Sequence, residues 1–592
     1  MKSFLKTVLA TIVGLLIVCL FIGFSSLIIL LGLAAEGTPM VEDNTVLVLK
    51  LNGEIEERST DNPFEEILGD EILDTQGLED IITAIHNAKD NPKVKGIYIE
   101  GGALSGASPA TLQEIRQALV EFKKSRKFIV AYADDYTQGT YYVASVADSV
   151  VINHQGMLDW KGLAMQSVYY KDLLDKIGVK MEIFKVGTYK SAVEPYFLNE
   201  MSEANKEQIT TFCTEIWRQM LTEVSKSRKI SPKSLNALAD SAILFAEPSF
   251  YKTSKLVDKL AYNDEVPVMI ARMMKVDSPE DYHTISVKDL ARSTQEEPKG
   301  LSGNIIAVYY AYGDIVDSPT SSLPEEAEIA ATTVCKDLQK LAEDDNVKAV
   351  VLRVNSGGGS AYASEQIWHE VMKIKAKKPI IVSMGDMAAS GGYYISCAAD
   401  WIVAEPTTLT GSIGIFGVFP VAEELLNDKL GLHFQTVKTN QFADFGDFSR
   451  QMNEGEKNAM QAYVNRGYEL FTKRCADGRK MNQNDIKKIA EGRVWTGEHA
   501  KQLKLVDQLG SLEDAIAVAK KKAKSTEATV ITYPEKSDLF TSLLEQMNTN
   551  SYADEKIHET LGEFYPLFRS VQKLDRHGSV EAKLPYYLIF NL

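Results

Sequence analysis

The stretch "IIVSMGDMAASGGYYISCAADWIV", residues 380–403, decides the fold because a second copy of it occurs earlier in the chain. The counterpart is "FIVAYADDYTQGTYYVASVADSVV", residues 128–151, and the two stretches align without a gap. In each, an apolar run is followed by a turn and then by an apolar segment of helical character. The pair therefore predicts the same strand, turn and helix at two places in the chain.

Four further pairs of segments recur in the same order, with a spacing near 250–260 residues. They are Asn44–Ile55 with Asn304–Ile315, Asn91–Glu100 with Asp345–Val354, 176–179 with 429–432, and 255–260 with 504–509. Five ordered pairs at one spacing indicate a duplicated domain. Short apolar runs alternate with longer amphipathic stretches in each copy, which is typical of β-α-β units whose strands lie under helices. The predicted fold class is therefore a tandem α/β protein.

The repeat divides the chain into five parts. They are an N-terminal transmembrane anchor (1–35), a first repeat (40–275), a linker (276–303), a second repeat (304–533) and a C-terminal extension (534–592). The linker is polar and contains two prolines, as connecting segments commonly do. A chain of 592 residues is too long for one ordinary domain, which agrees with this division.

Composition excludes several classes of function. The net charge of -17 argues against a nucleic-acid partner, because the phosphate backbone selects basic surfaces. The five cysteines are far apart and form no CxxC pair, so neither a zinc site nor a disulfide framework is expected. One bridge among the last four cysteines stays open, and Cys397 is expected to be a buried small hydrophobe. The residues indicate no metal and no cofactor.

The N-terminal segment is long and apolar. Thr7–Leu33 contains 27 residues without a charge, enough to cross a hydrocarbon core of about 30 Å as a helix. The apolar region of a secretory signal is only about 7–15 residues, so an uncleaved anchor is favoured over cleavage after Ala34-Ala35. Lys2 and Lys6 precede the span, and positive flanks stay in the cytoplasm. The rest of the chain is therefore expected to face outward.

The two copies differ at two positions where chemistry can reside. Ser390 of the second copy aligns with Gln138 of the first, so only the second copy offers a nucleophile at this turn. Lys190 lies in "KVGTYKSAVEPYFL", residues 185–198, and its counterpart in the second copy is Ala443. Serine stands in one copy and lysine in the other, which is the pattern expected if two half-sites are divided between the domains.

A serine hydroxyl needs a base to take its proton, and a neutral lysine amine can be that base. Lysine has an ordinary pKa of about 10.4, but desolvation by apolar neighbours lowers the pKa of a buried lysine by several units. Tyr189, Ala192 and Val193 offer such neighbours to Lys190. Attack on a carbonyl also needs donors for the oxyanion, and the Gly391 amide and the glycine run 357–359 are available.

Each element has a simpler explanation when taken alone. A Ser-Gly-Gly sequence after a strand is usually a turn, and an isolated lysine usually lies on the surface. The glycine run before a helix resembles a phosphate loop, but no Lys-Ser or Lys-Thr pair follows it. A histidine-based triad is the main competing mechanism, although none of the eight histidines lies in a recognisable motif. The matched difference between the copies favours the serine–lysine pair.

Four motifs resemble one known family. They are "YKSAVEPY" (189–196), "RVNSGGGSA" (353–361), "ASGGYY" (389–394) and "TGSIGIFG" (410–417). Together they are similar to signal peptide peptidase A in its long, tandem-domain form. The resemblance covers residues of about 40–530 in order, together with the N-terminal anchor.

The resemblance implies a Clp-protease/crotonase-like α/β fold after one transmembrane helix. It also implies a Ser/Lys dyad, no cofactor, a homo-oligomer of tetrameric type, and a catalytic body on the periplasmic side of the cytoplasmic membrane. The implied substrates are cleaved signal peptides and other short hydrophobic peptides.

The resemblance also assigns roles to individual residues. Ser390 is implied as nucleophile and Lys190 as general base. Gly358, Gly359 and Gly391 are implied as oxyanion donors. Ser412 is implied as the residue whose hydroxyl helps orient the lysine. The family usually has a proline where this chain has Gly357, and a glycine there enlarges the conformational freedom of the loop.

Three functional hypotheses follow. The first is a serine endopeptidase acting on hydrophobic peptides. The second is a crotonase-like acyl-CoA enzyme, which the expected outward topology disfavours because coenzyme A is a cytoplasmic metabolite. The third is a non-catalytic, membrane-anchored scaffold in which the glycine turns are purely structural.

Overall fold

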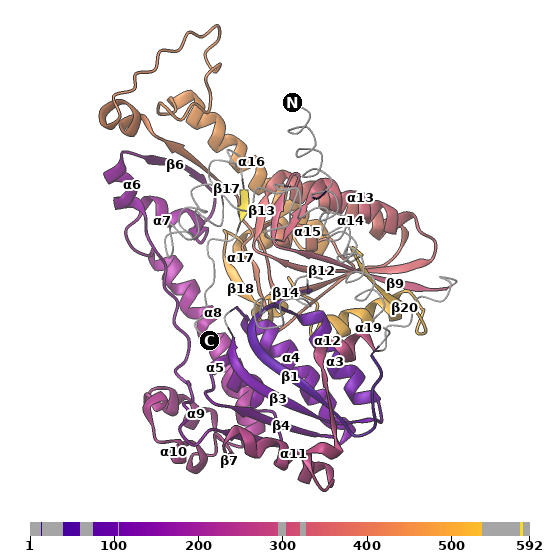
Figure 1. Cartoon of the computed structure of the whole chain (residues 1–592). Coiled ribbons are helices and arrows are strands. Elements are labelled where there is room, and N and C mark those ends of the chain that lie inside the picture. Colours follow the sequence, from indigo (N-terminus) through magenta and orange to yellow (C-terminus); the bar gives the residue numbers. More distant parts are fainter. Residues whose placement is uncertain are drawn as a thin grey trace, which may run out of the picture.

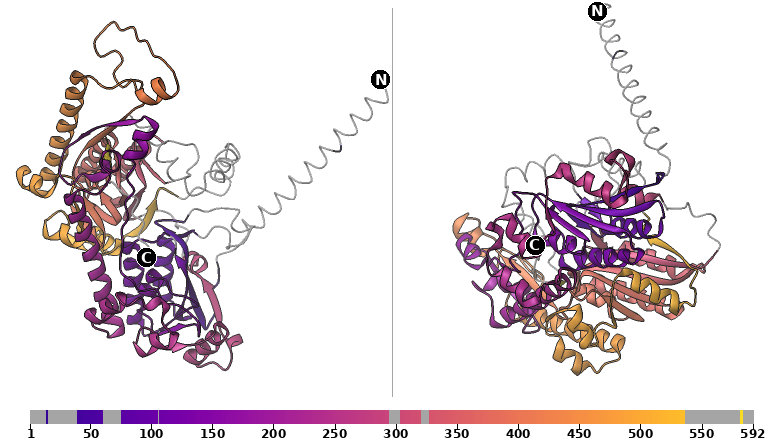
Figure 2. Two further views of the ribbon diagram at one scale, coloured as in Figure 1. Left: turned by 90° about the vertical axis from the view of Figure 1, so that its left-hand side faces the viewer. Right: turned by 90° about the horizontal axis from the view of Figure 1, so that it is seen from below.

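A computed structural model describes residues 14, 39–59, 75–104, 106–293, 303–319, 327–535 and 581–583. The predicted anchor lies outside these residues apart from Gly14, as does most of the C-terminal extension. Within the described residues, no helix has the length and apolar character needed to cross a membrane. The two halves of the chain form two neighbouring lobes, drawn from indigo to magenta and from rose to yellow (Figures 1 and 2).

The first half is built on a seven-stranded parallel sheet. Its strands are β1 (Thr45–Glu56), β2 (Thr75–Gly77), β3 (Val94–Leu104), β4 (Phe128–Ala133), β5 (Ser149–Ile152), β7 (Lys259–Leu260) and β8 (His283–Ser286). Six of them run in the order β2-β1-β3-β4-β5-β7, and β8 also pairs with β1. Each connection between neighbouring parallel strands needs a crossover, and helices supply it.

The second half repeats this sheet. Its strands are β9 (Ile305–Tyr312), β12 (Val347–Ser356), β14 (Ile380–Ala389), β15 (Trp401–Ala404), β16 (Leu409–Gly411), β18 (Val494–Thr496), β19 (Gln508–Leu509) and β20 (Thr529–Tyr533). The order β9-β12-β14-β15-β19 matches β1-β3-β4-β5-β7 of the first half strand for strand. The duplicated α/β fold is therefore confirmed.

Helices cover both faces of each sheet, with a buried cluster on either side. The first half contains the helices α3 (Leu78–Asp90), α4 (Pro109–Phe122), α5 (Gln138–Ala144), α6 (Lys171–Ile177), α7 (Glu194–Phe197), α8 (Glu203–Arg228), α9 (Pro232–Ala239), α10 (Pro248–Thr253), α11 (Val266–Met274) and α12 (Val287–Arg292). Those of the second half are α13 (Ala331–Glu343), α14 (Ala361–Lys377), α15 (Gly391–Ser396), α16 (Glu454–Arg479), α17 (Gln483–Ile489), α18 (Gly497–Gln502) and α19 (Leu512–Lys522).

The apolar pattern of the central strands explains this layering. Along β12, Val350 and Leu352 pack into one buried cluster, whereas Val351 packs into another on the opposite face. Successive side chains of a strand point to opposite faces, so a strand that is apolar throughout must be covered on both. The second half therefore has a core on each side of its sheet.

Part of the stretch predicted as a linker, residues 276–303, is folded. The strand β8 pairs in parallel with β1, and α12 buries Leu290 and Ala291. The alternation around Ile285, which is buried between exposed neighbours, provides the period of a strand. This segment completes the first sheet in the same way that β20 completes the second.

The four cysteines within the described residues are unbridged. The bridge that the sequence left open among Cys213, Cys335, Cys397 and Cys475 is therefore absent. Cys397 is buried, as predicted.

A third sheet joins the two halves. Its order is β11-β10-β13-β21-β17-β6, from β11 (Glu328–Ala330), β10 (Asp314–Val316), β13 (Gly358–Ser360), β21 (Glu581–Lys583), β17 (Phe416–Val421) and β6 (Lys180–Lys185). Of these, β6 belongs to the first half, and it pairs antiparallel with β17 of the second over six residue pairs. The segment that follows β6 is therefore delivered to the second lobe (Figure 1).

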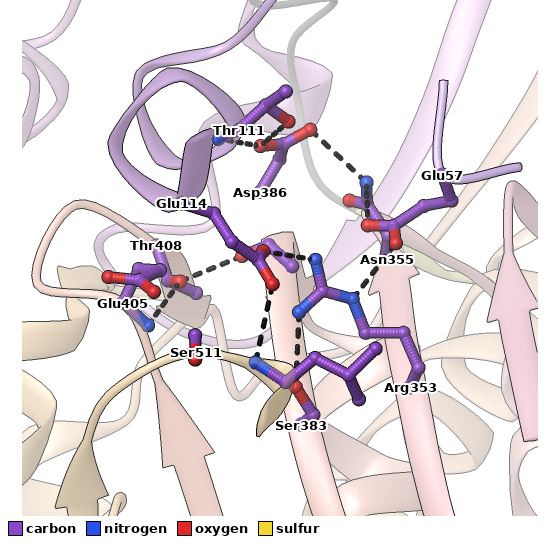
Figure 3. Close-up of polar contacts among 12 residues, drawn as sticks. Glu57, Thr111, Glu114, Arg353, Asn355, Ser383, Asp386, Glu405, Thr408 and Ser511 are labelled. Atoms are coloured by element: carbon purple, nitrogen blue, oxygen red, sulfur yellow. Dashed lines mark hydrogen bonds and ion pairs between the residues drawn. The ribbon is translucent and has the colours of Figure 1, made fainter. Parts of the chain in front are cut away.

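The interface between the two sheets buries charged side chains. Arg353 of β12 forms ion pairs with Glu57 at 2.9 Å and with Glu114 of α4 at 2.8 Å (Figure 3). Glu405 lies in the same interface, where Gln117 Nε2 donates to its Oε2 at 2.8 Å. Its Oε1 is buried and has no hydrogen-bond partner among the described residues. Burial, together with the nearby Glu114 carboxylate, raises the pKa of Glu405 to about 8.

This raised pKa predicts that the protein loses stability as the pH rises. Between the unfolded pKa of a glutamate, about 4.3, and the folded value of about 8, the native state holds a proton that the unfolded chain has released. The contribution of protonated Glu405 to the free energy of unfolding is therefore complete below about pH 4.3, and it is lost as the pH rises through about 8. A Glu405→Gln variant should melt close to wild type at pH 5 and at least about 3 °C higher at pH 8.5.

Thermal unfolding across this pH range measures the effect. Glu527→Gln, which removes an exposed carboxyl group, is the matched control and should track wild type. If the melting temperatures of wild type and Glu405→Gln changed with pH in parallel, the raised pKa of Glu405 would be contradicted.

Candidate active site

Ser390 lies at the junction between β14 and α15. Its backbone has φ 54° and ψ -112°, a strained conformation for a residue with a side chain. Two backbone hydrogen bonds hold it there: Ser390 N donates to Gly411 O at 2.9 Å, and Tyr394 N donates to Ser390 O at 2.9 Å. Strain of this kind persists only where the surroundings enforce it, and it is frequent at active sites.

The glycine pair after Ser390 has a steric reason. A Cβ atom at Gly392 would lie 2.6 Å from the backbone oxygen of Ser356 at the end of β12. Glycine therefore lets the first turn of α15 approach the glycine-rich segment closely.

Lys190 reaches Ser390 from the other half of the chain. It follows β6, and its Nζ donates to Ser390 Oγ at 2.8 Å across 200 residues of sequence. The same Nζ donates to Ser412 Oγ and to Ser412 O, each at 3.1 Å. All three side chains are fully buried. The structure thus brings together Ser390, Lys190 and Ser412, which the sequence places in three separate motifs.

The backbone of Lys190 is held by residues that the sequence did not single out. Tyr189 N donates to Glu491 O at 2.9 Å, and Gly492 packs so closely that a Cβ there would lie 2.6 Å from Lys190 Cα. Gly492 N in turn donates to Ile413 O at 2.9 Å, beside Ser412. The loop of the second half that contains Glu491 and Gly492 therefore contacts both Lys190 and the segment that carries Ser412.

Gln208 of α8 is a second residue that sequence reasoning missed. Its Nε2 donates to Tyr189 O at 3.2 Å and to Ser191 Oγ at 3.0 Å, on either side of Lys190. Its Oε1 accepts from Val494 N at 3.2 Å. No local motif marks Gln208, although a buried amide on a long helix indicates a partner within the fold.

Apolar side chains lie beside the lysine, as the sequence predicted in part. Ala192 and Val193 form a buried cluster with Phe416 and Val418, and the Phe416 ring centroid lies 5.8 Å from Lys190 Nζ. Burial in such surroundings disfavours a charged ammonium. Tyr189 is only half-buried, and its hydroxyl accepts from Arg493 Nη1 at 3.1 Å instead of lining this wall.

The glycine run 357–359 leads into the short strand β13. Gly358 and Gly359 have φ of 107° and 154°, in the region that favours glycine. The Gly358 amide donates to Ser356 Oγ at 3.1 Å, so this predicted oxyanion donor is engaged within its own loop. Gly391, the other predicted donor, follows Ser390 directly at the start of α15.

An extended segment lies between β13 and β17 in the third sheet. The strand β21 pairs antiparallel with β13, with Ala582 opposite Gly359, and reaches β17 at Phe416. The edges of β13 and β17 that face β21 therefore offer backbone partners to an extended chain segment.

In the first half, the side chain of Gln138 fills the turn that corresponds to Ser390. Gln138 is fully buried, and its Oε1 accepts from Lys161 N at 3.0 Å and from Gly162 N at 2.8 Å. Ala443, the sequence counterpart of Lys190, is exposed. The equivalent turn of the first half therefore has no nucleophile, and the second half has no lysine at the position that corresponds to Lys190.

The arrangement is suited to acyl transfer. A hydroxyl beside a buried amine, with a backbone amide next in sequence, supplies a nucleophile, a base and an oxyanion donor. Within the described ranges, no group of three or more His, Cys, Asp or Glu residues is placed to hold a metal ion.

Comparison with known proteins gives matches over most of the chain. Peptidase family S49 matches residues 121–277 and 372–526, and the Clp protease family matches residues 311–404. Protease 4 of Salmonella typhi is 37% identical over 516 residues, covering 85% of this chain and 82% of that protein. Protease 4 of Haemophilus influenzae is 32% identical, covering 98% of this chain and 96% of that protein.

Two further matches are a plant relative and a solved structure. The chloroplastic serine protease SPPA of Arabidopsis thaliana is 31% identical over 459 residues, covering 76% of this chain and 67% of that protein. Among solved structures, a ClpP1 mutant from Listeria monocytogenes matches with 17% identity and a TM-score of 0.24, covering 35% of this chain and 94% of that one.

The contact between Gly492 and Lys190 predicts a strong effect of a single methyl group. In a Gly492→Ala variant the Cβ must push the Lys190 backbone away, so the amine should leave hydrogen-bond distance of Ser390 Oγ. We expect the rate of Ser390 labelling by a fluorophosphonate to fall at least about 10-fold, since small displacements of a base are costly.

Gly446→Ala is the matched control, because Gly446 has a similar φ of 87° but nothing within 4 Å of its Cβ position. Equal labelling rates in the two variants would show that the contact does not position the lysine.

Proposed function

The chain belongs to peptidase family S49, and from this membership we propose that it is a membrane-anchored serine endopeptidase with Ser390 as nucleophile and Lys190 as general base. The carrying observation is the 2.8 Å hydrogen bond from Lys190 Nζ to Ser390 Oγ. A serine hydroxyl and its base must lie within this distance for the proton to pass between them. Membership in a peptidase family also argues against the acyl-CoA enzyme and the scaffold.

The first chemical step forms an acyl-enzyme. Neutral Lys190 takes the hydroxyl proton as Ser390 Oγ attacks the scissile carbonyl carbon. The carbonyl oxygen becomes an oxyanion that accepts from the Gly391 amide and from the glycine strand. When the tetrahedral intermediate collapses, the C–N bond breaks and the Lys190 ammonium gives its proton to the leaving amine. The new N-terminus departs and the acyl group stays on Ser390.

The second step releases the acyl group. Lys190, again neutral, takes a proton from water as that water attacks the ester carbonyl. Collapse breaks the bond to Ser390 Oγ, which regains its proton from the lysine. Ser412 holds the amine through its hydroxyl and its carbonyl, so Nζ points at Ser390 throughout both steps. Gly358 can join the oxyanion site only when its amide leaves Ser356 Oγ.

The proposed substrates are cleaved signal peptides and other short hydrophobic peptides, bound in extended form. The position of β21 supports this mode, because this strand lies between β13 and β17 and pairs its backbone with β13. The buried cluster of Ala192, Val193, Phe416 and Val418 beside Lys190 supports a preference for apolar side chains. Backbone pairing supplies affinity and the apolar wall supplies selectivity.

We further propose that Thr7–Leu33 anchors the protein, with the two repeats on the periplasmic side of the cytoplasmic membrane, and that it forms a homo-oligomer of tetrameric type. The uncharged length of the segment and its preceding lysines support the anchor. Membrane association that persists after removal of residues 1–35 would overturn this part of the proposal.

The dyad predicts the effect of three substitutions. Ser390→Ala removes the nucleophile and Lys190→Met removes the base while keeping an apolar chain of similar length. Each should lower kcat for a leader-like hydrophobic peptide by at least about 10³-fold, as loss of one member of a catalytic unit does. Gln138→Ala changes the equivalent turn of the first half and should keep kcat within about twofold of wild type.

Steady-state hydrolysis of a fluorogenic peptide by the full-length protein in detergent checks these values. Circular dichroism of each variant verifies that it is folded. Activity near wild type in either dyad variant would remove the mechanism.

A further inference from the structure

The strand that carries the nucleophile has an irregularity just before it. Pairing between β12 and β14 is regular up to Val354 opposite Met384, and it resumes with Ser356 opposite Ala388. The β14 strand therefore has two more residues than its partner across this interval, which forms a bulge around Gly385–Met387. At the same place β14 exchanges its other neighbour, from β15 to β16. Bulges of this kind redirect a strand and are frequent beside active sites.

The bulge turns the Asp386 carboxylate toward the first half of the chain, where it meets the N-terminus of α4 (Figure 3). Its Oδ1 accepts from Thr111 N at 2.9 Å and from Thr111 Oγ1 at 2.7 Å. Ser108 Oγ donates to the same oxygen. Ser108 is the N-cap residue of α4 but makes no cap bond of its own, and the first turn contains no acidic residue. Asp386 therefore serves as the cap of a helix in the other domain.

The duplicated domain provides an internal control. The equivalent helix α14 is capped by its own Ser360, whose side chain accepts from Ala363 N at 3.2 Å. The residue that aligns with Asp386 is Asp134, and it accepts from Tyr132 and Asn153 of its own half. The cap between domains is therefore made only by β14, the strand that leads to Ser390. Asp134, at the equivalent position of the first half, caps no helix of the other domain in the described residues.

Two further side chains hold the bulge from within the second half. Asn355 Nδ2 donates to the second oxygen of Asp386 at 3.2 Å, while its Oδ1 accepts from Met387 N at 3.0 Å. Thr408 Oγ1 donates to Gly385 O at 2.7 Å. Asn355 also directly precedes Ser356 and the glycine run. The hydrogen bonds of Asp386 thus connect the strand that carries Ser390, the segment that leads to the glycine run, and the first domain.

We propose that Asp386 is a positioning residue: held by the N-terminus of α4, it fixes the bulge of β14 and with it the orientation of Ser390 four residues later. This proposal rests on the proposed function, because it assigns Asp386 a role in the attack by Ser390. It gives the first half a second contribution besides Lys190. Asp386 belongs to neither β13 nor β17, so peptide binding between these strands should change little when its bonds to α4 are weakened.

The test removes hydrogen bonds that residues of the first half donate to Asp386, and it changes no residue of the second half. The double variant Ser108→Ala, Thr111→Val removes two of the three donors to Asp386 Oδ1 and keeps the size of the Thr111 side chain. We expect kcat for a leader-like peptide and the rate of fluorophosphonate labelling of Ser390 each to fall about 10-fold. KM should stay within about twofold of wild type.

Two controls separate positioning from stability. Thr407→Val removes another hydrogen bond between the halves, from Thr407 Oγ1 to Gln113 Oε1 of α4 at 2.7 Å, without touching the bulge. Asp134→Asn changes the equivalent carboxylate of the first half. Both should keep the wild-type labelling rate, even where the melting temperature falls.

The outcomes are distinct. A double variant that is labelled as fast as Thr407→Val, at a similar loss of melting temperature, overturns the positioning role and leaves the proposed function standing. Wild-type protein that is not labelled at Ser390 at all overturns the proposed function itself. A fall in labelling rate confined to the double variant supports the proposal.

Discussion

The antiparallel pairing of β6 with β17 is the interaction on which the site depends. It takes a strand of the first half into the third sheet, beside strands of the second half, over the six pairs from Lys180–Val421 to Lys185–Phe416. Lys190 follows five residues after that strand, and this path brings its amine to Ser390. Without the pairing, the two side chains would belong to separate domains with separate cores.

The burial of the dyad follows from the same exchange. A lysine of one domain can be enclosed fully only if the other domain supplies the remaining walls, and here Phe416, Gly414 and Gly492 do so. Glycine at positions 414 and 492 makes room for the lysine chain, and Phe416 adds apolar surface. Enclosure excludes water from the amine, as the proposed role of a neutral base requires. The position of the amine and its burial therefore have one structural origin.

Much of this arrangement was predictable from the sequence because duplication leaves an internal comparison. The repeated segments predicted the α/β fold, and the differences at Gln138/Ser390 and Lys190/Ala443 pointed to the residues that the fold brings together. The buried Gln138 explains the first difference, since its amide occupies the turn that the serine occupies in the second half. Local patterns thus located the two side chains that meet in the candidate site.

The supporting residues could not be predicted in the same way. Gln208, Gly492 and Asp386 act through partners about 20 to 300 residues away, and no local spacing records such contacts. The engagement of Gly358 with Ser356 also depends on a loop conformation that a glycine run leaves open. Sequence patterns report periodicity and residue type, whereas these contacts depend on how the two domains meet.

Chemical rescue of a lysine-deficient variant tests the central claim most directly. In Lys190→Ala, a small primary amine such as ethylamine can enter the space that the side chain vacates and take the proton from Ser390. The account predicts that ethylamine restores peptide hydrolysis in proportion to the concentration of its free base, and that the double variant with Ser390→Ala stays inactive. Hydrolysis by Lys190→Ala that is already substantial without amine, or that no amine increases, would contradict it.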